Sequence, residues 1–170
     1  MEVLSSPERT RKPVISAVNG IAYGGGFELA IASDFLIAAE SARFAVPEIK
    51  LGLLPGFAIV RLQHIVGRAK AKEMSILGDP LDAAEACRLG IVLRVVSDDV
   101  LIREALAFAE RISAQPRLAV EMAKSFYNRG LGGDEMRHAI DGFPFLLMHA
   151  DAREGVKAFL EKRKPRFGEN

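Results

Sequence analysis

The sequence predicts an α/β core followed by a helical C-terminal region, and two observations support this prediction. Over residues 1–98, short runs of β-branched and apolar residues alternate with helical patterns. After Ser97 these strand-like runs stop, and apolar residues recur at the three- and four-residue spacing of amphipathic helices. We therefore expect a mixed core over residues 1–98 and a helical region over residues 99–170.

The first part of the core contains three expected strands. Residues 13–19 are short, β-branched and bounded by Pro and Asn-Gly, which is typical of a buried strand. Residues 35–39 form a second apolar run, and residues 43–46 form a shorter one that ends at Pro47. A cluster of three glycines precedes good helix formers between the first two strands, so we expect a helix over residues 27–33 that begins at the glycines.

The later elements are mostly helices, apart from a strand candidate at residues 91–96. Asp82 and Glu85 resemble a capping box, and Gly90 occupies the place of a glycine that ends a helix. No element is predicted in the polar residues 1–12. The C-terminal helices have many apolar faces, which favours packing against a partner subunit. The other helices are expected over residues 57–66, 70–77, 101–112, 118–126, 134–149 and 151–163.

The composition excludes several classes of protein. The 170-residue chain has a net charge of +1, which provides no long-range field to attract nucleic acid or an acidic membrane. Its one cysteine, Cys87, excludes an intramolecular disulfide and indicates a reducing compartment. The start lacks a secretory signal pattern, and no apolar run approaches the ~20 residues of a membrane helix. We therefore expect a cytoplasmic protein with no nucleic acid or membrane partner.

Several common catalytic motifs are absent from the sequence. It contains no dinucleotide-binding G-x-G-x-x-G, no P-loop, no nucleophile elbow and no metal-binding H-E-x-x-H. The three histidines are expected to be structural or surface residues, and Cys87 to be a buried, inert thiol. We therefore predict no metal site, and the chemistry is left to residues 20–56.

Gly24, Gly25 and Gly26 are the first feature of that stretch. They follow a strand and begin a helix, and their lack of side chains lets a ligand approach the backbone. The N–H groups at a helix start have no intrahelical partner and lie at the positive end of the helix dipole. Such a place suits an anion, or a carbonyl oxygen that becomes one. A tight turn that packs against a neighbour would give the same pattern, so both interpretations stay open.

Glu28 and Glu48 are the candidate catalytic carboxylates. Glu28 lies among apolar residues in the first turns of the expected helix, and Glu48 follows Pro47. Each alone is also explained by a favourable interaction with a helix dipole. Because both follow strand-like segments, one cleft could hold the pair. Paired carboxylates in a partly apolar pocket can activate a water and transfer a proton.

Four segments carry a set of motifs in a fixed order, and they span residues 12–34, 44–55, 77–92 and 151–167. Together they resemble the enoyl-CoA hydratase (crotonase) family, and the resemblance covers nearly all of residues 11–168. It implies a spiral of ββα turns, present in part over residues 1–98. It also implies that residues 99–170 are a helical region used in trimer assembly.

The resemblance also implies catalytic roles. Members of the family bind acyl-CoA thioesters and stabilise the thioester oxygen with two backbone N–H groups, one of which corresponds to Gly25. Hydratases of the family carry two catalytic glutamates, which correspond to Glu28 and Glu48. We therefore expect a hydratase-like lyase that adds water reversibly across the 2,3 double bond of an enoyl-CoA, in fatty-acid or related acyl-CoA metabolism.

Further expectations concern the coenzyme A and the partners. Gly24 and Gly26 are expected to contact the substrate, and Phe159 and Lys162 to reach a CoA, in their own subunit or a neighbouring one. A core aromatic and a solvated lysine are the alternative for the last two. No metal or redox cofactor is expected, since CoA is part of the substrate. The expected partners are an acyl-CoA and further copies of the chain, as a trimer or a dimer of trimers.

Two departures from the family pattern leave other functions open. The family has a substantial part before the first strand, which supplies early strands, much of the CoA site and the second oxyanion N–H. Residues 1–11 show no counterpart, so the chain resembles an N-terminally truncated member; losing one such donor typically costs ~10²–10³ in kcat. The loop after Pro55 is one residue shorter, and Phe57 and Ile59 replace glycines. The alternatives are an isomerase, a carnitinyl-CoA-type dehydratase, a thioester hydrolase, or an inactive remnant or assembly subunit.

Overall fold

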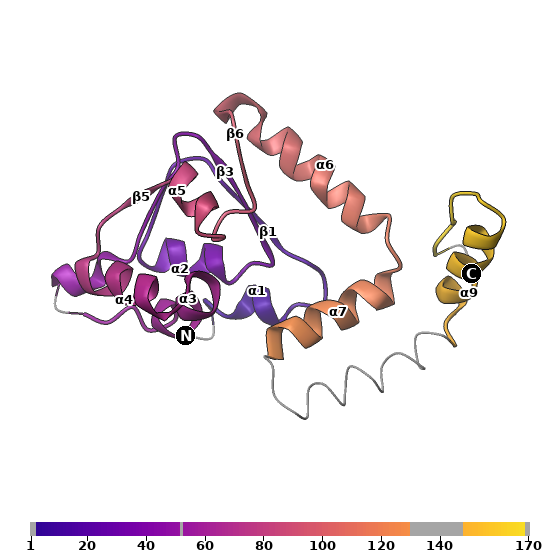
Figure 1. Ribbon diagram of the computed structural model, residues 1–170, viewed down its shortest axis with the longest axis horizontal. Coiled ribbons are helices and arrows are strands. Elements are labelled where there is room, and N and C mark those ends of the chain that lie inside the picture. The colour runs from indigo at the N-terminus through magenta and orange to yellow at the C-terminus, as the bar shows by residue number, and fades with distance from the viewer. Residues whose placement is uncertain (1–2, 52, 130–147, 169–170) are drawn as a thin grey trace. The chain divides into compact units, whose positions relative to one another are not determined.

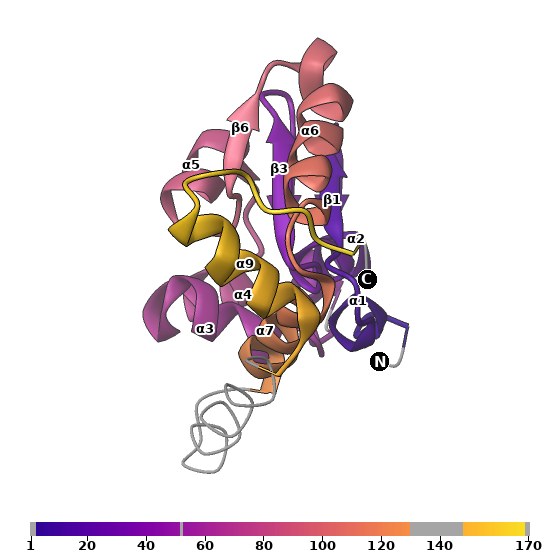
Figure 2. The same cartoon turned by 90° about the vertical axis from the view of Figure 1, so that its right-hand side faces the viewer.

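The computed structural model describes residues 3–51, 53–129 and 148–168. The chain divides into two compact units, Met1–Ala107 and Phe108–Asn170. We describe each unit by itself (Figures 1 and 2). None of the described helices combines the length and the apolar character needed to cross a membrane.

The first unit contains two three-stranded sheets. Its strands are β1 (Ile15–Val18), β2 (Ile21–Tyr23), β3 (Phe35–Ala39), β4 (Arg43–Ala45), β5 (Leu81–Asp82) and β6 (Arg94–Val96). Its helices are α1 (Ser6–Arg9), α2 (Gly25–Ile31), α3 (Ala58–Val66), α4 (Arg68–Leu77) and α5 (Ala83–Arg88), the 3₁₀ helices η1 (Pro47–Leu51) and η2 (Asp98–Val100), and the start of α6 (Leu101–Ser113).

The strand pairing makes successive segments of the chain stack on one another. One sheet has the order β1-β3-β6 and is parallel, while the other has the order β2-β4-β5, with β2 and β4 parallel. Ile15 pairs with Phe35 in the first sheet, and Ile21 pairs with Arg43 in the second. Each turn of the chain therefore adds one strand to each sheet, which is a spiral of β-strand pairs.

Helices α2, α3 and α4 gather at one end of the strands β1 and β3 (Figures 1 and 2). Helix α2 packs against β2, β3 and α3, and α4 packs against α3 and η1. Phe27 of α2 and Phe44 of β4 are fully buried, with ring centroids 5.6 Å apart. This aromatic pair fixes the start of α2 against the sheet, and with it the glycine cluster that precedes Phe27.

The described part of the second unit is helical. It contains the end of α6, then α7 (Arg117–Arg129) and α9 (Ala150–Leu160). His149 caps α9, because its Nδ1 accepts the backbone N–H of Asp151 at 3.3 Å. The helix expected over residues 134–149 lies almost entirely outside the described residues, as do the glycine-rich residues 130–133 before it.

The structure confirms most of the predicted elements and adds five short ones. The strand at residues 35–39 has the predicted bounds, and Asp82 caps α5 by accepting the Glu85 N–H at 2.8 Å. The strand expected over residues 91–96 begins only at Arg94. The elements that were not predicted are α1, β2, β5 and the 3₁₀ helices η1 and η2, each of two to five residues. They are too short to show a periodic pattern, and the chain around them decides their conformation.

Candidate active site

The start of α2 is built on an unusual backbone conformation at Gly24. Its φ of 55° and ψ of −129° lie in a region that only glycine adopts readily. The Gly24 N–H donates to the Ala45 carbonyl at 3.0 Å, and the Gly24 carbonyl accepts the Glu28 N–H at 2.9 Å. Gly24 therefore anchors the helix start to β4 and begins the helical turn that carries Glu28.

Glu28 is buried, and its carboxylate contacts a different helix. The side chain is 6% exposed, and its Oε1 accepts the backbone N–H groups of Phe57 at 2.9 Å and Ala58 at 2.8 Å. Those two groups stand at the start of α3, where no intrahelical acceptor exists for them. Glu28 thus caps α3 from outside, and its Oε2 is the oxygen left for another contact.

The Glu48 carboxylate, carried by η1, lies at the start of α2. A Cβ placed on Gly24 would lie 3.1 Å from the Glu48 Oε1, so that carboxylate faces the glycine directly. The Glu48 Oε2 is buried and has no hydrogen-bond partner among the described residues. A buried polar atom without a partner is costly in a folded protein, and such atoms are characteristic of functional sites.

The Glu48 carboxylate thus lies at the start of α2, where the Gly24 carbonyl also accepts the Glu28 backbone N–H, while the Glu28 carboxylate lies at the start of α3. Gly25 and Gly26 follow as the first residues of the helix, and a Cβ at either position would meet nothing within 4 Å. The backbone of both residues is exposed. The two exposed glycines therefore leave room for a ligand beside the helix start, as the interpretation of the cluster as an anion site requires.

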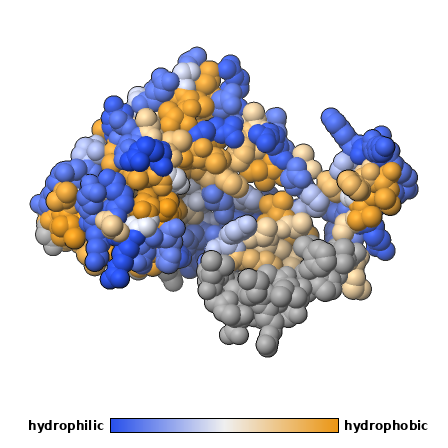
Figure 3. Space-filling view, viewed as in Figure 1, coloured by the Kyte–Doolittle hydropathy of each residue, from blue (hydrophilic) through white to orange (hydrophobic). Residues whose placement is uncertain are grey.

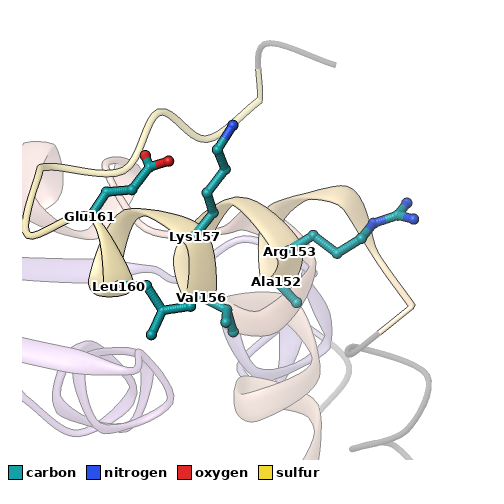
Figure 4. Close-up of a pocket in the computed structure, with 6 residues that line it drawn as sticks. All are labelled: Ala152, Arg153, Val156, Lys157, Leu160 and Glu161. Atoms are coloured by element: carbon teal, nitrogen blue, oxygen red, sulfur yellow. The ribbon is translucent and has the colours of Figure 1, made fainter.

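Phe159 and Lys162 belong to the second unit. The Phe159 side chain is 81% exposed on α9, and Lys162 has a φ of 55° just after the helix ends. Val156 and Leu160 are also exposed. Together with Lys157 they line a shallow pocket on α9, and their side chains point away from that of Lys157 (Figure 4). The roles expected for Phe159 and Lys162 at a CoA stay predictions, as does the expected division of the chain at residue 98.

The loop after Pro55 shows what sequence reasoning missed. Phe57 was expected only as a bulky replacement for glycine, but its ring is 6% exposed and its N–H binds Glu28. The Arg61 guanidinium stands over that ring, 5.7 Å from its centroid, and pairs with Glu8 at 2.7 Å. The sequence predicts no element in the polar residues 1–12, where Glu8 lies. The one sequence signal for the contact between Glu28 and Phe57 is the predicted helix start at residue 57, which implies unsatisfied N–H groups there.

The histidines and the cysteine have other surroundings or lie outside the described residues. His64 is exposed on α3, His149 caps α9, and His138 lies outside the described residues. Cys87 was expected to be buried but is half-buried in α5, where it packs against the core. In the described ranges, no group of three or more His, Cys, Asp or Glu side chains is arranged to hold a metal ion.

Several large apolar residues that neighbour the candidate site residues in the sequence are exposed to solvent. Figure 3 shows apolar side chains among polar ones on the surface of the first unit. The exposed apolar neighbours of the glycines and the two glutamates are Tyr23, Leu29, Ile49 and Ile59. Two carboxylates, a helix start and exposed apolar side chains next to them in the sequence suit an acyl compound whose carbonyl gains negative charge.

Comparison with solved structures defines the class of fold. The structure superimposes on an enoyl-CoA hydratase from Mycobacterium smegmatis with a TM-score of 0.92 and 37% identity, covering 98% of this chain and 66% of that one. An enoyl-CoA hydratase from Bacillus anthracis gives a TM-score of 0.92 at 34% identity, with the same coverage. The expected partial spiral core of the crotonase type is therefore confirmed.

Sequence comparison defines the family. The model of the enoyl-CoA hydratase/isomerase family matches residues 2–170, and the chain belongs to that family. It is 46% identical over 161 residues to a probable enoyl-CoA hydratase of Rhizobium meliloti and 43% identical over 164 residues to a crotonyl-CoA hydratase of Syntrophomonas wolfei. These matches cover 92% and 94% of this chain but 63% of each relative. The chain thus spans just under two thirds of the length of these relatives.

Proposed function

We propose that this protein is a hydratase-like lyase that adds water reversibly across the 2,3 double bond of an enoyl-CoA thioester. The observation that carries the proposal is that the Glu48 carboxylate faces Gly24, whose carbonyl accepts the backbone N–H of the buried Glu28. The relatives named as enoyl-CoA and crotonyl-CoA hydratases support it. Hydration is redox-neutral, so the proposal needs no redox cofactor. The acid–base steps are assigned to the two glutamates and not to a metal, and CoA enters as part of the substrate.

The proposed reaction assigns one proton transfer to each glutamate. The water oxygen forms a bond to C3 while one glutamate takes a proton from that water. The electron pair of the double bond moves toward the thioester oxygen, and the other glutamate then delivers a proton to C2. The Gly25 N–H stabilises the developing negative charge on the thioester oxygen. Before the next cycle, the glutamate that took the proton from water releases it to solvent, and the glutamate that protonated C2 regains a proton from solvent.

The surroundings of the two carboxylates limit which atoms can hold the water. Glu28 Oε1 is committed to the Phe57 and Ala58 N–H groups, which leaves its Oε2. Glu48 Oε2 is buried without a partner in the described part of the chain. In the proposed reaction one water donates to both of these oxygens, which would give the Glu48 Oε2 a hydrogen-bond partner.

Substrate and assembly contacts form the second part of the proposal. Gly24 and Gly26 would line the thioester site, and Phe159 and Lys162 would contact a CoA. The exposed apolar residues Val156, Phe159 and Leu160 on α9 favour packing against further copies of the chain, as a trimer or a dimer of trimers. The cytoplasmic location expected from the sequence stays a prediction.

A second candidate function is dehydration of a carnitinyl-CoA. One relative, 41% identical over 166 residues, is a carnitinyl-CoA dehydratase of Citrobacter koseri. The replacement of loop glycines by Phe57 and Ile59 makes the surroundings of Glu28 differ from the family pattern, which favours an altered substrate range. Assays of crotonyl-CoA hydration and carnitinyl-CoA dehydration on the same preparation separate the two functions. Turnover of carnitinyl-CoA alone would replace the main proposal.

A further inference from the structure

We propose that Glu8 is a positioning residue for Glu28, acting through Arg61 and the backbone of Phe57. The proposal rests on the function proposed above, because it assigns Glu8 a role in that reaction. It concerns a contact that neither the sequence nor the proposed reaction explains: a side chain from residues 1–12 that pairs with Arg61 in the first turn of α3.

Glu8 stands on a fixed turn of the chain. Pro7 of α1 is buried, and the Thr10 Oγ1 hydrogen-bonds to the carbonyls of Pro7 at 3.0 Å and Lys12 at 2.9 Å. The Glu8 side chain is 16% exposed, and its Oε2 accepts from the Arg61 Nη2 at 2.7 Å. A charge-assisted bond of this length, partly shielded from water, restrains the guanidinium more than an exposed surface pair does.

Arg61 in turn contacts Phe57 in two ways. Its guanidinium lies 5.7 Å from the centroid of the Phe57 ring, within the range of a cation–π contact. Its backbone N–H donates to the Phe57 carbonyl at 3.2 Å, in the first turn of α3. The ring and the carbonyl of Phe57 are therefore both held by one residue, whose side chain is oriented by Glu8.

The last step joins Phe57 to the catalytic carboxylate. The Phe57 and Ala58 N–H groups both donate to Glu28 Oε1. Any rotation of the Phe57–Ala58 backbone changes the direction of both donors and therefore the position of the Glu28 carboxylate. Loss of the Glu8 charge would leave Arg61 free to turn away from the Phe57 ring, and the loop would lose its external restraint.

The substitution Glu8→Gln tests this proposal, with Glu85→Gln as the matched control. Glu85 also pairs with an arginine, Arg88, at 2.6 Å, but on α5 and without contact to the loop. Two readouts are needed: kcat and KM for crotonyl-CoA hydration, and the ¹H–¹⁵N resonances of the Phe57 and Ala58 amides. The amide resonances report the two hydrogen bonds directly and do not depend on activity.

For Glu8→Gln we expect kcat to fall about tenfold at unchanged KM, since a misplacement of 1 Å can cost ~10²-fold. The Phe57 and Ala58 amide resonances should move, while Glu85→Gln changes neither readout. Arg61→Gln should give the same changes, and the double variant should be no worse than either single one. Glu8→Asp, which keeps the carboxylate, should recover most of the lost kcat.

The proposal is overturned if the Phe57 and Ala58 resonances stay in place in a folded Glu8→Gln protein. It is also overturned if those resonances move but an active enzyme keeps its kcat. A general loss of amide dispersion would show that Glu8 only stabilises the fold. If the unsubstituted chain hydrates no enoyl-CoA, the proposed function fails and the catalytic role of Glu8 fails with it. The amide resonances then still decide whether Glu8 orients the Phe57–Ala58 backbone.

Discussion

Gly24 lies so close to Glu48 that a Cβ on the glycine would stand 3.1 Å from the carboxylate Oε1. The φ of Gly24 is 55° with ψ at −129°, so any other residue would also be strained there. The backbone of Gly24 therefore limits where the Glu48 carboxylate can lie, and its carbonyl begins the helical turn that carries Glu28, the other glutamate proposed to be catalytic.

Gly24→Ala should lower both stability and hydration. We expect a loss of about 1–3 kcal/mol in the free energy of unfolding from the strained backbone. We also expect a larger than tenfold fall in kcat, because the new methyl group displaces Glu48. Gly67→Ala is the control, since Gly67 has a φ of 77° and open space around it. It should lose stability while keeping its kcat. Equal activity in both variants would show that Gly24 does not position Glu48.

Two substitutions of Glu28 should separate its structural contribution from its catalytic one. Glu28→Ala removes the acceptor for the Phe57 and Ala58 N–H groups. It should lower the free energy of unfolding by about 1–2 kcal/mol, the usual cost of losing a helix cap. Glu28→Gln keeps an acceptor oxygen and should retain most of the stability while losing hydration. Denaturant unfolding and the hydration assay together test this, and equal stabilities of the two variants would contradict the capping role.

Glu48→Gln should abolish hydration with little effect on acyl-CoA binding. The Glu48 Oε2 makes no hydrogen bond in the described structure, so the free energy of unfolding should change by less than about 1 kcal/mol. Calorimetric titration with a saturated acyl-CoA measures the binding, and Glu40→Gln, an exposed residue at the end of β3, serves as a control. Weakened binding alongside lost hydration would assign Glu48 to substrate binding instead.

The residues that follow α9 should keep their contacts with Glu154 of α9 down to low pH. The Arg163 guanidinium, with the Arg166 backbone N–H, lowers the pKa of the Glu154 carboxyl from 4.5 to about 2. A native pKa below the unfolded value means that the contribution to stability is present above pH 4.5 and is lost as the pH falls through about 2. NMR titration of Glu154 checks this. Arg163→Gln should return the pKa toward 4.5, and a value near 4.5 in the unsubstituted chain would contradict the prediction.

The sequence predicts the elements that carry a strong local signal. The β-branched run at residues 15–18, the apolar run at residues 35–39 and the cap at Asp82 all form as their residue types suggest. Such signals are local, since strand propensity and capping depend on a few adjacent residues. The short strands β2 and β5 exist only because β4 lies between them, and that pairing cannot be read from three residues.

The candidate site can be predicted only in part from the sequence, because local signals again show only some of its residues. The glycine cluster and the two glutamates are visible because their types and order carry the family pattern. The partners that hold Glu28 are not visible, because they are backbone N–H groups of Phe57 and Ala58, which any residue can supply. The pairing of Glu8 with Arg61 joins residues far apart in the chain, and only the folded structure brings them together.

Hydration of crotonyl-CoA by the purified 170-residue chain tests the central claim most directly. Loss of the conjugated enoyl-thioester absorbance follows the reaction, with Glu48→Gln measured beside it. We expect the unsubstituted chain to convert crotonyl-CoA to its hydrated product and the Glu48→Gln chain to leave it unchanged. A folded chain that hydrates neither crotonyl-CoA nor longer enoyl-CoAs, or hydration that persists in Glu48→Gln, would contradict the assignment of Glu28 and Glu48 as the catalytic pair.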